Sequence, residues 1–511
     1  MALVAATLTY SCSTEPIDEP TPPLPQASGY FAVTLALDDK DPATRAYTGE
    51  ALGSIQERLV DELYIMLYRQ SDGTLAYRIP VAATNNSSST VVNFSGAGVS
   101  TLSPAASDRL ITIGYQVATA PYHMVVMANP TASMKAATVP ATFPLTLSDF
   151  KTTTANDLFA TFPTNTTTIV PSLRFPMTNS RGEVAVSVTD LKPSQAAAEA
   201  APIAVALDRT VAKIETVKTT GASGFDANMT ALIAAGTLKA YQNLSWDLDV
   251  TNKLSYYLRG KANTSAGTPE VATDARSSLY ATDPNMAAIA VSGTTPYTTN
   301  FTAATINNTY LTSNPTAKTI TTTSEPVYAL ENTFNIGVQA TGTWETQATN
   351  VVVKVQIIPG HQALNATDWT VGYYSIDGFV FTHAEAVTWV NEIIAIPSGA
   401  PVNLTVSNLK LNDWFWNGSM AITSKPIAYS TSNLGASKLV FHYNSWNVYR
   451  IPIKHFDTAP TNYGHYGVVR NNWYKVSINS ISGPGSGSSD KFISADVTIL
   501  QWLSRNQIED L

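Results

Sequence analysis

The chain has 511 residues, which is too long for one compact core, so we expect two domains or more. Charged residues make up 13% of it, about half of the usual share of roughly 25%, and its net charge of −8 comes without any basic run. These values argue against nucleic acid as a partner. The single cysteine, Cys12, excludes an intrachain disulfide and a cysteine-based metal site.

The first residues have the pattern of an export signal. Residues 3–11 are short and apolar and end in a small residue, as in the back half of a secretory signal, and Cys12 follows directly. We interpret residues 1–12 as a truncated lipoprotein signal segment with Cys12 as the acylation site. An ordinary buried or free thiol is the alternative. Proline-rich residues 13–28 predict an extended tether behind it.

The next segment predicts a half-buried strand that is followed by a cleavable loop. Apolar side chains alternate with small or polar ones at Phe31, Val33, Leu35 and Leu37, which is the period of a β-strand. A polar loop with one proline and one arginine, Arg45, comes next. Polar loops of this kind are preferred sites of proteolysis.

Short strands separated by turn signals occupy most of the remaining chain. Such a pattern predicts an all-β protein built of β-sandwiches with few short helices. We expect strands within residues 58–68, 122–130 and 183–188, a short helix or loop at 194–201, two strands crossing between domains at 203–217, and a second series at 244–258, 328–336, 351–358, 369–381, 402–409, 439–453 and 473–481. The one helix with a clear apolar period is residues 384–394.

No constellation of catalytic or metal-binding residues is evident, so we expect no enzyme activity, no cofactor and no metal. The six histidines lack metal-ligand spacing, and no strand leads into a hydrolase nucleophile elbow. Asp247 and Asp249 share one strand face, where a solvated sheet surface is favoured over a carboxylate pair. Trp414 and Trp416 are interpreted as core, with sugar stacking as the alternative.

The C-terminal stretch predicts a strand on a flexible linker. Residues 482–489 are rich in glycine and serine, and Ala495, Val497 and Ile499 then recur two apart, with Leu500 and Trp502 on the opposite face. A terminal strand on a linker can pair with its own domain or with another molecule. We favour the second possibility, and the sequence leaves open which of the two faces would enter the partner.

Two runs resemble the fimbrillin family of Bacteroidales, the stalk subunits of type V pili, and in particular the major subunits of the short (minor) fimbriae of Porphyromonas. They are Val469-Arg470-Asn471-Asn472-Trp473-Tyr474 and the terminal Val497-Thr498-Ile499-Leu500-Gln501-Trp502. Segments 207–213 and 328–333 and the N-terminal order of cysteine, strand and arginine loop resemble the same family.

The resemblance implies two transthyretin-like β-sandwich domains and export as a lipoprotein to the outer membrane. It implies that a trypsin-like arginine protease cuts between Arg45 and Ala46 and removes the first strand. The groove that is left would accept the C-terminal strand, 495–503, of the next subunit. The expected parts are then the tether and removable strand 13–45, an N-terminal domain 46–212, a C-terminal domain 213–481, and a linker with donor strand 482–511.

The expected partners are other copies of the chain, other fimbrial subunits including tip and anchor proteins, the maturation protease, and host or bacterial surface ligands bound during adhesion. Asp457-Thr458-Ala459 is similar to the O-glycosylation site of Bacteroidota, with Thr458 as the acceptor. A fimbrial tip or anchor subunit and a monomeric glycan-binding surface lipoprotein remain as alternatives.

Overall fold

The computed structural model describes residues 28–503 with gaps. The described residues are 28–36, 49–52, 57, 62–82, 84–85, 92–93, 110–111, 114–136, 146–155, 175–180, 182–258, 301–302, 317–333, 348–370, 372–376, 379–382, 384–385, 440–455, 466–485 and 492–503. Strands dominate this part of the chain, and the predicted all-β class is confirmed. No helix among these residues is long and apolar enough to cross a membrane.

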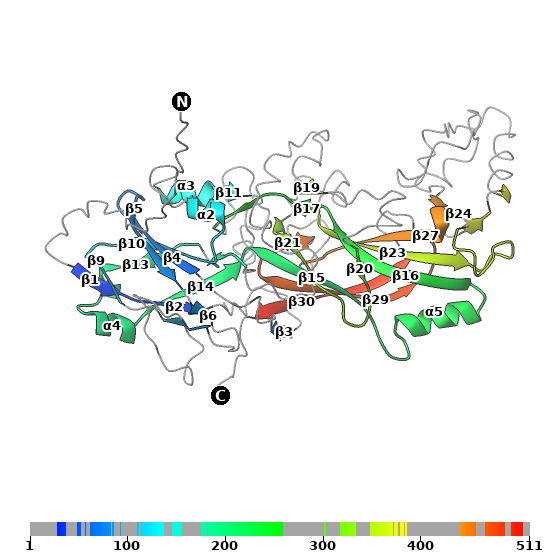
Figure 1. Ribbon diagram of the computed structural model, residues 1–511, viewed down its shortest axis with the longest axis horizontal. Helices are drawn as coiled ribbons and strands as arrows, with labels where there is room; N and C mark the ends of the chain where they lie inside the picture. The colour runs from blue at the N-terminus through cyan, green and yellow to red at the C-terminus, as the bar shows by residue number, and fades with distance from the viewer. Residues whose placement is uncertain are drawn as a thin grey trace, which may run out of the picture.

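The strands from β1 to β14, apart from β3, form most of the N-terminal lobe, on the left of Figure 1. Its main sheet has the strand order β5-β4-β10-β12-β14-β2-β8, with β13 beside β10 and a separate pair β1-β9. These strands are β1 Ser28–Phe31, β2 Val33–Ala36, β4 Glu62–Arg69, β5 Leu75–Ala82, β8 Leu110–Ile111, β9 Tyr115–Ala118, β10 Tyr122–Ala128, β12 Met177–Asn179, β13 Val184–Val186 and β14 Ile203–Arg209.

Two facing sheets form the C-terminal lobe, on the right of Figure 1, with strand orders β21-β15-β29-β30-β3 and β20-β16-β23-β27. Side chains of both sheets fill one core, for example Tyr474 from the first sheet and Trp246 and Val353 from the second. This lobe is therefore a β-sandwich. Its strands are β3 Gly49–Leu52, β15 Val211–Lys218, β16 Leu238–Asp249, β20 Lys318–Thr319, β21 Val327–Leu330, β23 Asn350–Pro359, β27 Trp446–Pro452, β29 Asn472–Ile481 and β30 Ile493–Leu503.

Short pairs and helices complete the described residues. The small sheets are β11-β18, β17-β19, β22-β28, β6-β7 and β25-β24-β26. Their strands are β6 Thr84–Asn85, β7 Val92–Asn93, β11 Thr154–Ala155, β17 Thr251–Asn252, β18 Ser255–Tyr256, β19 Phe301–Thr302, β22 Asn332–Thr333, β24 Tyr373–Ile376, β25 Phe379–Phe381, β26 Val440–His442 and β28 Gly467–Val468. The helices are α2 Ala132–Ala136, α3 Leu147–Thr152, α4 Gln195–Ala200 and α5 Phe225–Ala234, with the 3-10 turns η1 Val188–Asp190 and η5 Tyr443–Ser445.

The chain passes from one lobe to the other between β14 and β15. Both strands were predicted within residues 203–217, and both are present, with only Thr210 between them. Val211 packs in the core of the N-terminal lobe, and the next residue, Ala212, packs in the core of the C-terminal lobe. Successive strand side chains point to opposite faces, so one extended segment contributes to two cores.

Two local expectations differ from the structure. Helix α5 was not predicted, because its apolar residues do not follow a clear helical period; it packs Phe225 and Met229 into the core of the C-terminal lobe. Asp249 does not lie on a solvated sheet face, since it is buried and its Oδ2 lies 2.8 Å from Nη2 of Arg450. Of the expected helix 384–394, the structure describes only residues 384 and 385, which are helical.

Candidate functional site: the two terminal strands and the junction between the lobes

The N-terminal strand segment lies inside the main sheet of the N-terminal lobe. β2 runs parallel to β14, with Val33 opposite Ile203 and Leu35 opposite Val205, and antiparallel to β8 on its other side. Phe31, Val33 and Leu35 are each at most 1% exposed. Burying three such side chains stabilises the fold by about 5–9 kcal/mol, which is comparable to the whole stability of a typical domain.

The same segment is also buried on its other face. Ala32 is fully buried, and Thr34 is 7% exposed and lies between β14 and β8. The backbone N–H of Ile203 donates a 2.8 Å hydrogen bond to the carbonyl of Ala32. A central strand that is buried on both faces cannot leave the sheet without exposing a groove that has unpaired backbone groups on both sides.

The C-terminal strand lies at an exposed position in its own lobe. β30 is antiparallel to β29, where Ala495, Val497 and Ile499 face Ile478, Val476 and Tyr474 in the register. Of the β30 side chains that the structure describes, only Ile499 is buried, while Ala495 and Val497 pack against the core in part. Among the described side chains, β30 therefore buries fewer apolar groups completely than β1 and β2 do.

The outer edge of β30 is covered by a strand from the other end of the sequence. β3 pairs parallel with the last four residues of β30, from Gly49 opposite Leu500 to Leu52 opposite Leu503. Figure 1 shows β3 beside β30, away from β1 and β2. The chain that contains Arg45 thus connects β2 in one lobe to β3 in the other.

The glycine-rich linker is held in place over its first residues. The hydroxyl of Tyr449 donates to the carbonyl of Gly483 over 2.8 Å, and the backbone N–H of Gly485 donates to Oδ1 of Asn447 over 3.1 Å. A Cβ on Gly485 would lie 2.4 Å from the carbonyl oxygen of Val448, so only glycine fits there. Residues 482–485 are therefore packed on β27, contrary to the expectation of a flexible linker.

A buried charged cluster around Glu57 ties the segment after β3 to the junction between the lobes. Glu57 is 2% exposed, and its carboxylate lies 3.0 Å from Nζ of Lys213 and accepts a hydrogen bond from the hydroxyl of Tyr328. Its backbone carbonyl accepts from Nε of Arg209 over 2.9 Å. Burial raises the pKa of the Glu57 carboxyl, but Lys213, Tyr328 and Arg209 together outweigh burial and hold the pKa below its usual value.

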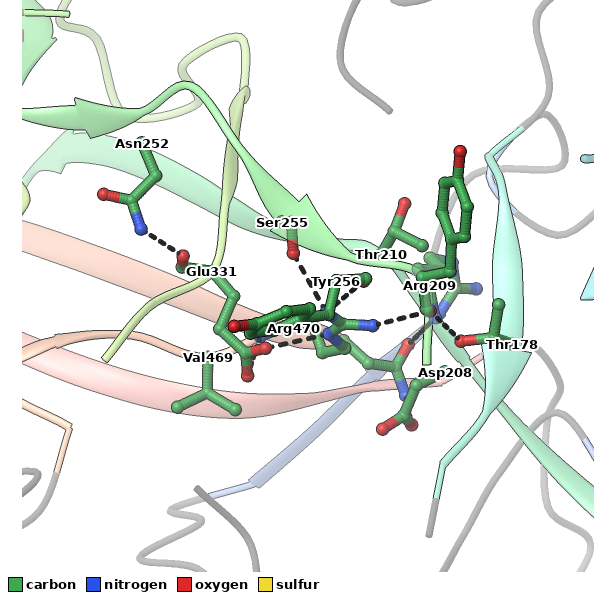
Figure 2. Close-up of polar contacts among 12 residues, drawn as sticks. Thr178, Asp208, Arg209, Thr210, Asn252, Ser255, Tyr256, Glu331, Val469 and Arg470 are labelled. Carbon is green, nitrogen blue, oxygen red and sulfur yellow. Dashed lines mark hydrogen bonds and ion pairs between the residues drawn. The ribbon is translucent and has the colours of Figure 1, made fainter. Parts of the chain in front are cut away.

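A second buried cluster, around Arg470, joins two other segments of the chain to the segment before β29 at this junction (Figure 2). Nε of Arg470 lies 2.9 Å from Oε2 of Glu331, and Nη2 donates to Oγ of Ser255 and to the carbonyl of Tyr256, each over 3.0 Å. Arg470 is 1% exposed. An arginine fork that is fully paired in this way fixes the relative positions of the strands that carry its partners.

The residue after Arg470 links the two clusters. Asn471 has a φ of 60°, a left-handed conformation that asparagine adopts more readily than most residues. Its side-chain oxygen accepts from Nη1 of Arg209 over 2.8 Å, and its side-chain nitrogen donates to Asp208 over 2.8 Å. The two segments that resemble the fimbrillin family, 207–213 and 469–474, thus meet here. The sequence alone did not predict this contact. It also did not point to Glu57, because the only sign of this residue's role in the sequence is that a carboxylate lies between apolar strands.

Several predicted site residues lie outside the described residues: Cys12, Leu37, Arg45, Ala46, Trp414, Trp416 and Thr458. For Trp502 only the backbone, within β30, is described. Among the described residues, no group of three or more His, Cys, Asp or Glu side chains could hold a metal ion. The buried His442 contacts Ser375 and the carbonyl of Trp446 within the fold, which fits the predicted structural role of the histidines.

Two protein-family models match the chain. Residues 31–224 match the major fimbrial subunit protein (FimA), and residues 441–507 match the C-terminal part of the major fimbrial subunit protein type IV, fimbrillin. Together the matches cover just over half of the chain, including β2, β14, β15 and β30. No curated protein matches the chain significantly.

Solved structures of low sequence identity are similar to the chain. A candidate cell adhesion protein from Parabacteroides distasonis is 13% identical, with a TM-score of 0.40 over 93% of this chain and 100% of that one. One from Bacteroides eggerthii is 13% identical, with a TM-score of 0.37 over 94% and 97%. The tip fimbrial protein Mfa3 from Porphyromonas gingivalis, with a C-terminal truncation, is 12% identical, with a TM-score of 0.32 over 93% and 100%.

The two family models match the segments that contain β2, the passage from β14 to β15, Arg470 and the C-terminal strand. The chain therefore belongs to the fimbrillin family of Bacteroidales and is a structural subunit that assembles with other fimbrial subunits at the cell surface.

Proposed function

We propose that the protein is a stalk subunit of a surface fimbria that polymerises by exchange of terminal strands. The precursor is exported as an outer-membrane lipoprotein acylated at Cys12. A trypsin-like arginine protease then cuts between Arg45 and Ala46, and β1 and β2 leave the N-terminal lobe. The C-terminal strand of another copy, 495–503, fills the groove that they leave.

The difference in burial between the two terminal strands supports this proposal. Phe31, Val33 and Leu35 are each at most 1% exposed, so β1 and β2 should stay in place while the chain is intact. Cutting the connection to β3 removes the covalent link that returns this strand to its groove each time it opens. By contrast, Ile499 alone is buried among the described side chains of β30, so β30 can leave its own sheet at lower cost.

The geometry of exchange also explains filament growth. The groove is in the N-terminal lobe, and the donated strand comes from the C-terminal lobe of a different copy. Such a contact is head-to-tail and does not close on itself, so it continues into a filament. The clusters around Glu57 and Arg470 would carry tension between the two lobes of each subunit.

We further propose the following division of the precursor: signal 1–12, removed segment 13–45, domains 46–212 and 213–481, and linker with donor strand 482–511. Within the range 46–212, β3 is an exception, because it pairs with β30 of the C-terminal lobe. Adhesion to host or bacterial surfaces and O-glycosylation at Thr458 belong to the same proposal. Within the family, a tip subunit would lack a donor strand, and an anchor subunit would keep its first strand uncut.

The decisive experiment blocks each half of the exchange separately. Arg45→Ala should leave the full-length precursor uncut and abolish SDS-resistant ladders, because β1 and β2 then stay in the groove. Deletion of residues 495–511 should allow cleavage but leave monomers. Arg69→Ala is the matched control, since Arg69 is an exposed arginine at the end of β4, and it should polymerise normally. Ladders that persist in the Arg45→Ala variant would remove Arg45 from the mechanism.

The alternatives give different results in the same assay. An anchor subunit stays uncut and cell-bound even with the wild-type sequence. A glycan-binding surface lipoprotein remains a monomer after cleavage and loses sugar binding when Trp414 or Trp416 is replaced by alanine.

A further inference from the structure

We propose that β3 is a clasp on the donor strand, which must open before β30 can leave its own lobe and which therefore sets the rate of strand exchange. β3 comprises Gly49–Leu52, so it would stay on the subunit after a cut between Arg45 and Ala46. This inference rests on the proposed function, because it concerns the release of β30 to another copy.

The two ends of β30 have different strand partners. Residues 493–501 pair with β29, and residues 500–503 pair with β3. Within the described sheet, residues 502 and 503 therefore have β3 alone as a strand partner, while residues 500 and 501 lie between two strands. The contact with β3 begins directly after Ile499, the one described side chain of β30 that is buried.

A hairpin holds the other end of β30. The backbone N–H of Ser482 donates to the carbonyl of Phe492 over 2.8 Å, and the side-chain nitrogen of Asn479 donates to Oδ2 of Asp496 over 2.8 Å. The chain between Ser482 and Phe492 also joins β30 covalently to β29. Because this end stays joined to its partner strand, β30 must separate first at the opposite end, which is the end that β3 covers.

The pairing of β3 with β30 is weak enough to open before the pairing of β29 with β30. β3 forms four register pairs with β30, against nine for β29. Its ladder is parallel, and parallel pairing is slightly less stable per residue than antiparallel pairing. Three of its four residues are glycine, glutamate and alanine, which are depleted in strands. It also lies at the edge of its sheet, so it has a strand partner on one side only.

Glu57 keeps the clasp close to β30 after it opens. The Glu57 carboxylate lies 3.0 Å from Nζ of Lys213, and its backbone carbonyl accepts from Nε of Arg209 over 2.9 Å. Glu57 follows Leu52 by five residues, which span at most about 18 Å when fully extended. An opened β3 therefore stays near the junction and can close again on β30, so that closing competes with donation.

The test isolates one donation step between two variants. The donor is full-length Arg45→Ala, whose groove stays filled, and the acceptor is the cleaved chain without residues 495–511, which has a groove and no donor strand. The rate of formation of SDS-resistant heterodimers is measured at increasing acceptor concentration. If the clasp must open first, this rate should reach a ceiling that equals the rate of opening.

A weakened clasp should raise this ceiling. In a strand the N–H groups point alternately to its two sides, so one proline of the pair Glu50→Pro/Ala51→Pro removes an N–H that bonds to β30. A donor with these two substitutions should show a ceiling at least about tenfold higher, which corresponds to about 1.4 kcal/mol. The matched control is Lys318→Pro/Thr319→Pro in β20, an edge strand of the facing sheet that pairs with β16, and it should leave the ceiling unchanged.

The other outcomes separate the clasp from the exchange itself. An equal or lower ceiling in the Glu50→Pro/Ala51→Pro donor would overturn the clasp, and so would a rate that rises with acceptor concentration without a ceiling. If neither donor forms heterodimers with a folded acceptor, the proposed strand exchange fails, and the clasp fails with it.

Discussion

Arg470 is the most completely paired charged side chain at the junction. The burial of its partners determines how much stability the protein loses when Arg470 is replaced. Its partners come from two other segments of the chain, Glu331 from one and Ser255 and Tyr256 from the other, and Glu331 is itself 4% exposed. Removing the guanidinium leaves a buried carboxylate without its countercharge. Breaking a buried ion pair from one side typically costs about 3–5 kcal/mol.

We therefore expect Arg470→Ala to lower the free energy of unfolding by about 3–5 kcal/mol, measured by urea denaturation. The double variant Arg470→Met/Glu331→Leu should recover much of this loss, because neither charge is then buried alone. A loss of equal size in both variants would show that packing, and not the uncompensated carboxylate, carries the effect.

His442 makes the stability of the C-terminal lobe depend on pH. The carbonyl of Trp446 can only accept, so Nδ1 of His442 donates to it, and Nε2 then accepts from the hydroxyl of Ser375 over 2.7 Å. Burial lowers the pKa of His442 to about 4, although the bond to Trp446 opposes the shift. The folded protein thus favours the neutral ring.

The sign of this dependence follows from the direction of the shift. Below the ordinary pKa of about 6.5 the unfolded chain binds a proton that the folded chain does not, so stability is complete above pH 6.5 and falls as the pH drops toward 4. The loss should reach about 3 kcal/mol. Urea denaturation between pH 7 and pH 4 measures it, and His442→Asn should flatten the curve. A curve that keeps its full slope in that variant would assign the dependence to other groups.

At the scale of the strands, the contact between β3 and β30 predicts that a disulfide between them would prevent β30 from leaving its own lobe. Glu50 and Gln501 are register partners on these two strands. Neighbouring strands lie about 4.8 Å apart, which is within the Cα separation that a disulfide spans. In the variant Glu50→Cys/Gln501→Cys, oxidation should hold β30 on its own lobe, and the cleaved protein should stay monomeric until a reductant is added.

The matched control is Gln242→Cys/Gln356→Cys, which links β16 to β23 within the same lobe. It should polymerise equally well with and without reductant, because neither strand leaves its sheet. Polymerisation of the oxidised Glu50→Cys/Gln501→Cys variant at the wild-type rate would contradict the release of β30 as the donor.

At the scale of the whole molecule, head-to-tail exchange predicts two kinds of chain terminator. A subunit with Arg45→Ala keeps its groove filled but can donate β30, so it can end a filament at one end only. A subunit without residues 495–511 can accept a strand but cannot donate one, so it ends the filament at the other end. Either variant, added in small amounts to wild type during cleavage, should shorten the filaments seen by negative-stain microscopy.

The double variant, uncut and without a donor, is the control and should leave filament length unchanged. If it shortened the filaments as much as the single variants do, the effect would come from a contact other than strand exchange.

The sequence alone determined the all-β class, the two strands at 203–217, and the terminal strands that carry Phe31, Val33 and Leu35 and Ala495, Val497 and Ile499. It could do so because alternation with a period of two depends only on neighbouring residues and on which face is buried. Helix α5 was not predicted because its apolar residues follow no clear helical period, and the sheet on which it packs determines which of them are buried.

Only the tertiary structure decided which residues meet across the chain. Glu57 with Lys213, Arg470 with Glu331, and β3 with β30 join segments that are far apart in sequence, and no local pattern records such pairs. The structure also decided that β2 is central and buried on both faces while β30 is lightly buried. That difference depends on which strands flank each segment, and under the proposed exchange it is the physical reason why one terminal strand would need cleavage to leave and the other would not.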